Sequence, residues 1–171
     1  NGNFGEVLAA GDFNGDGVDD LAAAAPYGSE PVTCPGIRCG FVVVRYGSPA
    51  GGLAPQMIAV LHEGSAATLS NDNFGSALAT GDFDDDGYDD LAIGMRGQVV
   101  GGFENAGAVM VVYGGILGVN GSYGAEIFDR DSDGLTFSPR INDYYGWSLT
   151  TGDFDADGDA EGVAAEHRGV V

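Results

Sequence analysis

The sequence predicts an all-β fold built from a repeated unit of about 70 residues. An acidic loop occurs three times, starting at Asp12, Asp82 and Asp153, which are 70 and 71 residues apart. The chain contains 31 Gly, and its Val, Ala and Tyr residues recur in short runs without a long helical period. Self-similarity at a fixed period is typical of repeat architectures, in which each repeat is one supersecondary unit. These observations favour an all-β repeat protein over a helical one.

Each acidic loop has the residue pattern of a calcium-binding loop. In the second loop, acidic side chains occupy positions 1, 3, 5 and 9, and Gly87 at position 6 permits a sharp turn. Ca²⁺ takes roughly 6–8 oxygen ligands, which alternate side chains and the backbone carbonyl of position 7 can supply. The predicted ligands are Asp12, Asn14, Asp16, Val18 and Asp20 in the first loop, Asp82, Asp84, Asp86, Tyr88 and Asp90 in the second, and Asp153, Asp155, Asp157, Asp159 and Glu161 in the third. We therefore expect about three calcium ions, one for each loop.

Two features distinguish these loops from an EF-hand. An EF-hand loop requires Glu at position 12 and a helix on each side, whereas position 12 here holds Ala23, Ile93 and Ala164. The flanking residues are small or β-branched and are interrupted by Gly, a pattern typical of short strands. Each loop is therefore predicted to join two strands.

The strand pattern divides the chain into units at residues 1–72, 73–144 and 145–171. The first unit is predicted to hold strands at 4–10, 20–25, 41–46 and 56–61, and the second at 75–80, 90–94, 107–113 and 124–129. The third unit starts near residue 145 and holds about two strands. The recurrent aromatic residues are predicted to form the core between units: Phe4, Phe13, Phe74, Phe83, Tyr145 and Phe154.

Short motifs accompany the loops. Phe4-Gly5 and Phe74-Gly75 stand at the start of two units, and Ala24-Ala25-Pro26 follows the first loop. With the loops, these motifs resemble the FG-GAP repeats of integrin α-subunit β-propellers and of many secreted bacterial proteins. Gly94-Met95-Arg96 and Ala165-Glu166-His167 depart from the GAP motif. The resemblance extends over essentially the whole chain and implies a partial β-propeller of about two and a half four-stranded blades, with calcium loops between the first and second strands.

A propeller avoids exposed sheet edges by radial closure, typically with 4–8 blades of four strands. Two and a half blades cannot close, so the resemblance implies that further blades or other copies of the chain complete the ring. It also implies an extracellular or cell-surface location. All six basic residues are Arg, a composition that we take to indicate a bacterial source.

The charge of the chain narrows the range of partners. The net charge is −20, from 26 acidic and six basic residues, so nucleic acid is not an expected partner. More than half of the acidic residues lie inside the three loops, where their repulsion is relieved by a cation. The hydrophobic fraction of 44% argues against a disordered acidic chain. No apolar run approaches the roughly 18–20 residues of a membrane span.

The two cysteines, Cys34 and Cys39, flank a turn-rich Pro35-Gly36-Ile37-Arg38 segment. Proteins of the kind that the chain resembles are usually exported to an oxidising compartment, so a disulfide between Cys34 and Cys39 is predicted. A pair of free thiols is the alternative. A zinc site is disfavoured because no His or further Cys lies nearby in the sequence.

Two weaker motifs remain. Asp129-Arg130-Asp131-Ser132-Asp133-Gly134 imitates the first half of a metal loop, but Phe137 occupies position 9. Asn120-Gly121-Ser122 fits an N-glycosylation acceptor, a tripeptide that is frequent by chance. We favour neither as a used site.

No catalytic motif is evident. His62 and His167 lie far apart, without a Ser or Cys in a nucleophile motif. The Gly residues follow the repeat and lack the Lys-Ser/Thr pair of a phosphate loop. The dense carboxylate clusters are already assigned to calcium. We therefore predict a protein that is not an enzyme.

The favoured function is an extracellular, calcium-stabilised propeller module for adhesion, recognition or surface assembly, in which the metal is structural. By analogy with the family, a protein or carbohydrate ligand would bind the rim opposite the calcium loops, at Tyr27 to Arg38, His62 to Asn73 and Met95 to Glu104. The alternatives are an accessory propeller of a secreted hydrolase and a structural protomer of a surface fibre.

Overall fold

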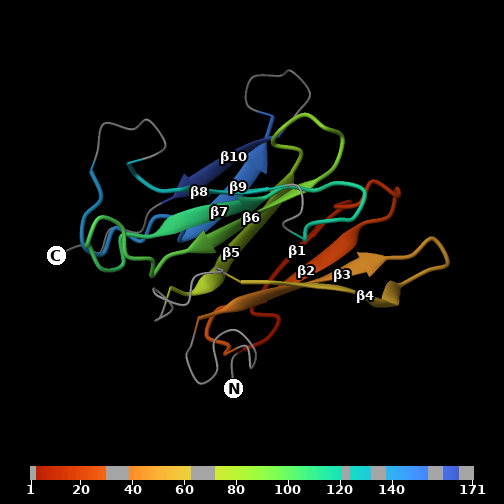
Figure 1. Cartoon of the computed structure of the whole chain (residues 1–171), viewed down its shortest axis with the longest axis horizontal. Coiled ribbons are helices and arrows are strands. Elements are labelled where there is room, and N and C mark those ends of the chain that lie inside the picture. Colours follow the sequence, from red (N-terminus) through yellow and green to blue (C-terminus); the bar gives the residue numbers. More distant parts are fainter. Residues whose placement is uncertain are drawn as a thin grey trace.

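The computed structural model describes residues 3–29, 39–62, 72–120, 124–131, 138–153 and 160–165, with the backbone alone at 55–58 and 161–165. These residues form ten β-strands in three antiparallel sheets that follow one another along the chain (Figure 1). Within them there is no helix, and so none that is long and apolar enough to cross a membrane. The all-β prediction is confirmed, and the sheets form a partial β-propeller that is not closed into a ring.

The strands occur in the predicted order. The first sheet holds β1 (Val7–Gly11), β2 (Asp20–Ala25), β3 (Phe41–Gly47) and β4 (Leu53–Leu61), the second β5 (Phe74–Gly81), β6 (Asp90–Met95), β7 (Ala108–Val112) and β8 (Ala125–Phe128), and the third β9 (Ser148–Gly152) and β10 (Glu161–Ala165). β1 starts three residues later than predicted, because Gly5 adopts φ 80° and its N–H donates to the Ala24 carbonyl oxygen at 2.9 Å. This turn is open only to residues that tolerate positive φ, and Gly is the main one.

β6 is buried at every residue, because neighbouring sheets cover both of its faces. Successive side chains of a strand point to opposite faces. Accordingly Leu91, Ile93 and Met95 pack into the core shared with the first sheet, whereas Ala92 faces the core shared with the third. A Cβ at Gly94 would lie 2.3 Å from the Gly146 carbonyl oxygen, so this face of β6 accepts only small residues. The sequence of β6 therefore fits a strand in the centre of the molecule.

The same backbone contact joins each sheet to the next. Gly40 forms a parallel bridge with Phe74, and Gly107 forms one with Tyr145. A Cβ at Gly40 would lie 2.3 Å from the Phe74 carbonyl oxygen, and one at Gly107 would lie 2.2 Å from that of Tyr145. Both glycines also have positive φ, so no other residue satisfies the two requirements together.

The predicted aromatic core is confirmed at four of its six positions. Phe13 and Phe74 are fully buried, Tyr145 is 9% exposed, and Phe83 packs against the second core. Phe4 was predicted to be buried and is 59% exposed; among the described residues, no further sheet lies before the one that holds β1. Phe154 lies outside the described residues.

Candidate metal sites in the acidic loops

Each acidic loop joins the first and second strands of its sheet, as predicted. Across the three strand pairs, Gly11 faces Asp20, Gly81 faces Asp90, and Gly152 faces Glu161. Positions 1 and 9 of every loop are therefore brought to the same end of an antiparallel pair. This is the arrangement in which side chains from both ends of a loop can reach one ion.

The first two loops have the same internal hydrogen bonds. The Asp12 carboxylate accepts from the N–H groups of Asp16, at 3.0 Å, and Gly17, at 2.7 Å. The Asp82 carboxylate accepts from Asp86, at 3.1 Å, and Gly87, at 2.8 Å. A side chain that bonds amides further along its own loop replaces a backbone turn, so the carboxylate of position 1 is fixed over the loop.

The glycine at position 6 is required by conformation. Gly17 has φ 84° and Gly87 has φ 88°. No heavy atom lies within 4 Å of a Cβ built at either residue, so the space beside them is open. Glycine is favoured at position 6 by its left-handed backbone and not by lack of space. This conformation turns the chain sharply, so that positions 5 and 7 come back toward position 1. The Val18 and Tyr88 N–H groups then donate to the carboxylates of Asp16 and Asp86, at 2.9 and 3.0 Å.

Three carboxylates of the second loop gather around one point. Ligand oxygens of Asp82, Asp84 and Asp86 all lie within 4.8 Å of one another, and Asp84 and Asp86 are exposed. Partial desolvation by the loop, and then the charges of Asp86 and Asp82, raise the pKa of the Asp84 carboxyl. In the part of the chain that the structure describes, no Arg side chain pairs with them. Carboxylate oxygens are the donors that Ca²⁺ and Mg²⁺ prefer, so the donor set fits a hard divalent cation.

The first loop differs at position 3. Asn14 replaces the carboxylate with an amide oxygen, which accepts the Asp16 N–H at 2.9 Å. An amide oxygen remains a suitable ligand for Ca²⁺. The first loop thus has the same geometry as the second and one negative charge fewer among its predicted ligands.

The aspartates at position 9 are buried beneath the loops, a placement that the sequence pattern did not indicate. Asp20 accepts N–H groups from Phe13, at 3.1 Å, and Gly47, at 2.7 Å. Asp90 accepts from Phe83 and Gly114, both at 2.8 Å. Burial raises the pKa of each carboxyl to about 6, although these hydrogen bonds act in the opposite direction. Each oxygen retains a lone pair, so the carboxylate can both tie the loop to the third strand and face a cation.

The third loop is described at its ends alone. Asp153 is exposed, and Glu161 begins β10. The predicted ligands Asp155, Asp157 and Asp159 lie outside the described residues. The third site therefore stays a prediction, supported by the shared register of its flanking strands.

The remaining sequence motifs have separate outcomes. The Asp129 carboxylate accepts the Asp131 N–H at 2.8 Å, while residues 132–137 lie outside the described part, so an ion there stays a prediction. Cys39 is 4% exposed and Cys34 lies outside the described residues, so the disulfide is also untested. Asn120 donates from its side-chain amide to the Leu117 carbonyl oxygen at 3.1 Å.

An aromatic and cationic cluster lies at the opposite ends of the strands. The sequence analysis placed Tyr27 and Arg96 in the contact surface, but it did not connect them with Tyr144 and Trp147. Arg96 follows β6, and its guanidinium donates to the Tyr27 hydroxyl of the first blade. It also lies 4.4 Å from the ring centroid of Trp147, just before β9, and Tyr144 packs on that ring edge-on at 5.6 Å. The signal in the sequence that could have indicated the cluster is Arg96, which stands where the GAP motif has Pro. Of the predicted contact surface, residues 30–38 and 63–71 lie outside the described part.

The comparisons with known proteins agree with this fold. Residues 4–36 and 74–112 match the FG-GAP repeat, so the chain contains FG-GAP repeats. The chain is 34% identical to phosphatidylinositol-glycan-specific phospholipase D of Rattus norvegicus over 98% of its own length and 20% of that protein. It is 30% identical to integrin alpha-7 of Homo sapiens, over 91% of the chain and 11% of the integrin. Integrin alpha-IIb of Mus musculus is 37% identical over 56% of the chain and 8% of the integrin.

The chain thus spans about a fifth, or less, of the length of the curated relatives it matches. The homology covers the repeat region that the structure shows as blades. It supports a structural module, since FG-GAP repeats form the propeller framework itself. Activities named for the relatives belong to proteins several times longer than this chain.

Proposed function

We propose that the chain is a calcium-binding β-propeller module of an extracellular protein that serves adhesion, recognition or surface assembly. The gathering of the Asp82, Asp84 and Asp86 carboxylates in a loop that repeats the geometry of the first is the observation that carries the proposal. Without a cation, the negative charges of these three carboxylates would repel one another. Each complete loop would bind one Ca²⁺, and about three would bind to the chain.

The ion would be structural. It would contact positions 1, 3 and 5 through side chains, position 7 through its carbonyl and position 9 from below, where Asp90 also accepts the Gly114 N–H. By neutralising these groups, the ion would connect the first, second and third strands of a blade. The carboxylates of positions 1 and 9 are already bonded to backbone amides of the blade, so we propose stabilisation rather than catalysis.

Chelation provides the central test. An ion at about 100 times its Kd stabilises a folded chain by roughly 2.7 kcal/mol per site, which corresponds to about 5–10 °C in Tm for a chain of this size. Calorimetry with excess calcium and with excess chelator should show at least this shift. Identical melting curves, together with metal analysis that finds empty loops, would contradict the proposal.

Two matched variants test the ligand assignment. Asp82→Asn and Asp85→Asn each remove one negative charge from the second loop, and Asp85 at φ 61° tolerates Asn without a change of backbone. We expect Asp82→Asn to lower calcium affinity at this loop at least tenfold and Asp85→Asn to lower it much less. Equal losses in isothermal titration would show that bulk charge, and not ligation, decides binding.

The outer face of β1 is the proposed contact with further blades or with other copies of the chain. Phe4 and Leu8 are 59% and 58% exposed there, whereas the equivalent Phe74 is buried and Leu78 packs into the first core. On the rim opposite the acidic loops, Arg96 lies within the proposed surface for a protein or carbohydrate ligand, and we add Trp147, whose ring contacts the Arg96 guanidinium. Trp147 is 38% exposed and so remains available for contact.

An accessory propeller of a secreted hydrolase is the second candidate, favoured by the similarity to phosphatidylinositol-glycan-specific phospholipase D across 98% of the chain. The sequence of the full-length gene separates the candidates, because a catalytic domain beside the repeats favours this one. We also propose the extracellular location and the Cys34–Cys39 disulfide. Thiol titration of the unfolded chain with and without reductant tests the disulfide.

A further inference from the structure

The acidic loops of the first two blades are in direct contact. The Asp12 N–H donates to the Asp89 carboxylate at 2.8 Å, and the Asp89 N–H donates to the Asp12 carbonyl oxygen at 3.2 Å. A Cβ at Gly15 would lie 2.6 Å from the ring of Tyr88, so that ring rests on the turn of the first loop. Two consecutive residues of the second loop therefore hold the first loop at two points.

These contacts reach groups that belong to both candidate metal sites. Asp12 is position 1 of the first loop, and its carboxylate is already fixed by the N–H groups of Asp16 and Gly17. Tyr88 is position 7 of the second loop, where its carbonyl is the expected ligand. Tyr88 thus offers its carbonyl to the second candidate site, while Asp89 holds the backbone of Asp12, the first predicted ligand of the other site.

We propose that Asp89 is a positioning residue that couples calcium binding at the two loops, an inference that rests on the proposed function. An ion in the second loop fixes the Tyr88 carbonyl and with it the Asp89 carboxylate. The fixed carboxylate holds the Asp12 peptide, so the first loop is preorganised for its own ion. Because linkage is reciprocal, an ion in the first loop raises the affinity of the second by the same factor.

The repeat supplies the equivalents that this proposal needs for comparison. Asp19 is the corresponding residue of the first loop, and it is exposed with no hydrogen-bond partner for its carboxylate among the described residues. Ala160 is the corresponding residue of the third loop. A Cβ at Gly81 would lie 2.8 Å from its methyl group, which cannot accept a hydrogen bond. Within this chain, the hydrogen bond between the first and second loops therefore has no equivalent between the second and third.

The test measures calcium affinity at each loop separately, in the whole 171-residue chain. The amide signals of Gly17 and Gly87 report the first and second loops in NMR titrations with calcium in competition with a chelator. Asp89→Ala should weaken binding at Gly17 about fivefold or more. Asp19→Ala, which truncates the same residue type inside the first loop itself, should weaken binding at Gly17 less. A smaller effect of Asp89→Ala than of Asp19→Ala at Gly17 would overturn the proposal.

Two further variants separate positioning from loss of structure. Asp89→Asn keeps an oxygen acceptor for the Asp12 N–H and should restore most of the affinity at Gly17. Asp16→Ala removes a ligand of the first loop and should weaken binding at Gly87 by the coupling factor, without any change in the second loop. Unchanged affinity at Gly87 would overturn the coupling while leaving calcium binding intact. Absence of calcium binding at both signals in the unaltered chain would instead reject the proposed function, and the coupling with it.

Discussion

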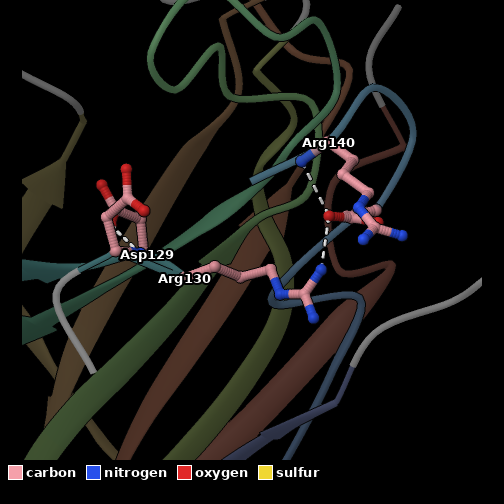
Figure 2. A network of polar contacts seen from close by, with 5 residues as sticks. Asp129, Arg130 and Arg140 are labelled. Carbon is pink, nitrogen blue, oxygen red and sulfur yellow. Dashed lines mark hydrogen bonds and ion pairs between the residues drawn. The ribbon is translucent and has the colours of Figure 1, made fainter. Parts of the chain in front are cut away.

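A guanidinium nitrogen of Arg130 lies 2.6 Å from a carboxylate oxygen of Asp143, and the two side chains are only 4% and 7% exposed. The same oxygen accepts the backbone N–H of Arg140 at 2.8 Å, and Asp129 lies apart from this pair (Figure 2). Arg130 follows β8, and Asp143 precedes β9. The ion pair therefore fastens the outer edge of the second blade to the start of the third.

Removing one partner of this pair should be costly. Asp143→Ala removes the carboxylate that pairs with the buried guanidinium of Arg130, and the loss of one partner of a buried ion pair costs about 3–5 kcal/mol. Arg140→Ala is the matched control, because Arg140 contributes its backbone N–H and is exposed. Chemical denaturation should show a large loss of unfolding free energy for the first variant and less than about 0.5 kcal/mol for the second. Similar losses for both would show that the buried pair is not what fastens the blades.

The bridging glycine of the second blade should tolerate no side chain. Gly107→Ala places a Cβ 2.2 Å from the Tyr145 carbonyl oxygen, so backbone must move. Gly102 is the control, since it has φ 87°, close to the 83° of Gly107, and no heavy atom within 4 Å of a built Cβ. Gly102→Ala should lower the free energy of unfolding by about 1–2 kcal/mol, which is the cost of a left-handed backbone for a residue with a Cβ. Gly107→Ala should cost at least about 2 kcal/mol more, measured by thermal denaturation. Equal losses for the two variants would mean that the backbone at Tyr145 can move away from the new Cβ at little cost.

The stability of the chain should fall in alkali through Tyr46. Burial, and next the charge of Asp20, raises the pKa of Tyr46 to about 12. An unfolded tyrosine ionises near pH 10, so between pH 10 and 12 the folded state holds the extra proton and its stability falls as pH rises. This one group accounts for roughly 2–3 kcal/mol over that range. Tyr46→Phe should flatten the pH dependence of unfolding there, in metal-free buffer. An unchanged slope would contradict the shift.

The cluster of Tyr27, Arg96, Tyr144 and Trp147 should hold three blades together. Arg96→Ala removes the hydrogen bond to Tyr27 and the cation over Trp147, which together contribute about 1–2 kcal/mol. Arg96→Lys keeps a cation near the ring but loses the planar fork, so it should recover part of this. Trp147 is the single Trp of the chain, and its fluorescence reports the contact directly. Spectra that are identical in the unaltered chain and Arg96→Ala would show that the contact is not formed in solution.

The sequence was sufficient to predict the strands because their signals are local. The strand at 20–25 was predicted with the bounds of β2, and the others deviate by a few residues at their ends. These signals are the fixed spacing of the loop residues and the alternation of apolar positions, and both can be recognised within a few neighbouring residues. The position of the acidic loops between first and second strands follows from the same local pattern.

The burial of Asp20 and Asp90 could not be predicted in this way. Their hydrogen-bond donors include Gly47 and Gly114, which lie 27 and 24 residues further along the chain. Such partners become known only once the third strand is placed beside the second. The same holds for Asp12 and Asp89, which are 77 residues apart and belong to different sheets. Periodicity identifies equivalent residues, but it does not show which of them touch across the boundary between repeats.

The glycine contacts at Gly40 and Gly107 place the backbone of each sheet directly against the segment that begins the next. Because backbone meets backbone there, a side chain at either glycine would push two neighbouring blades apart. The same close contact occurs at both boundaries between sheets, so it is a repeated feature of the way in which one blade follows another. In a fold assembled this way, these glycines would help to set the angle between blades, and with it the number of blades that closes a ring.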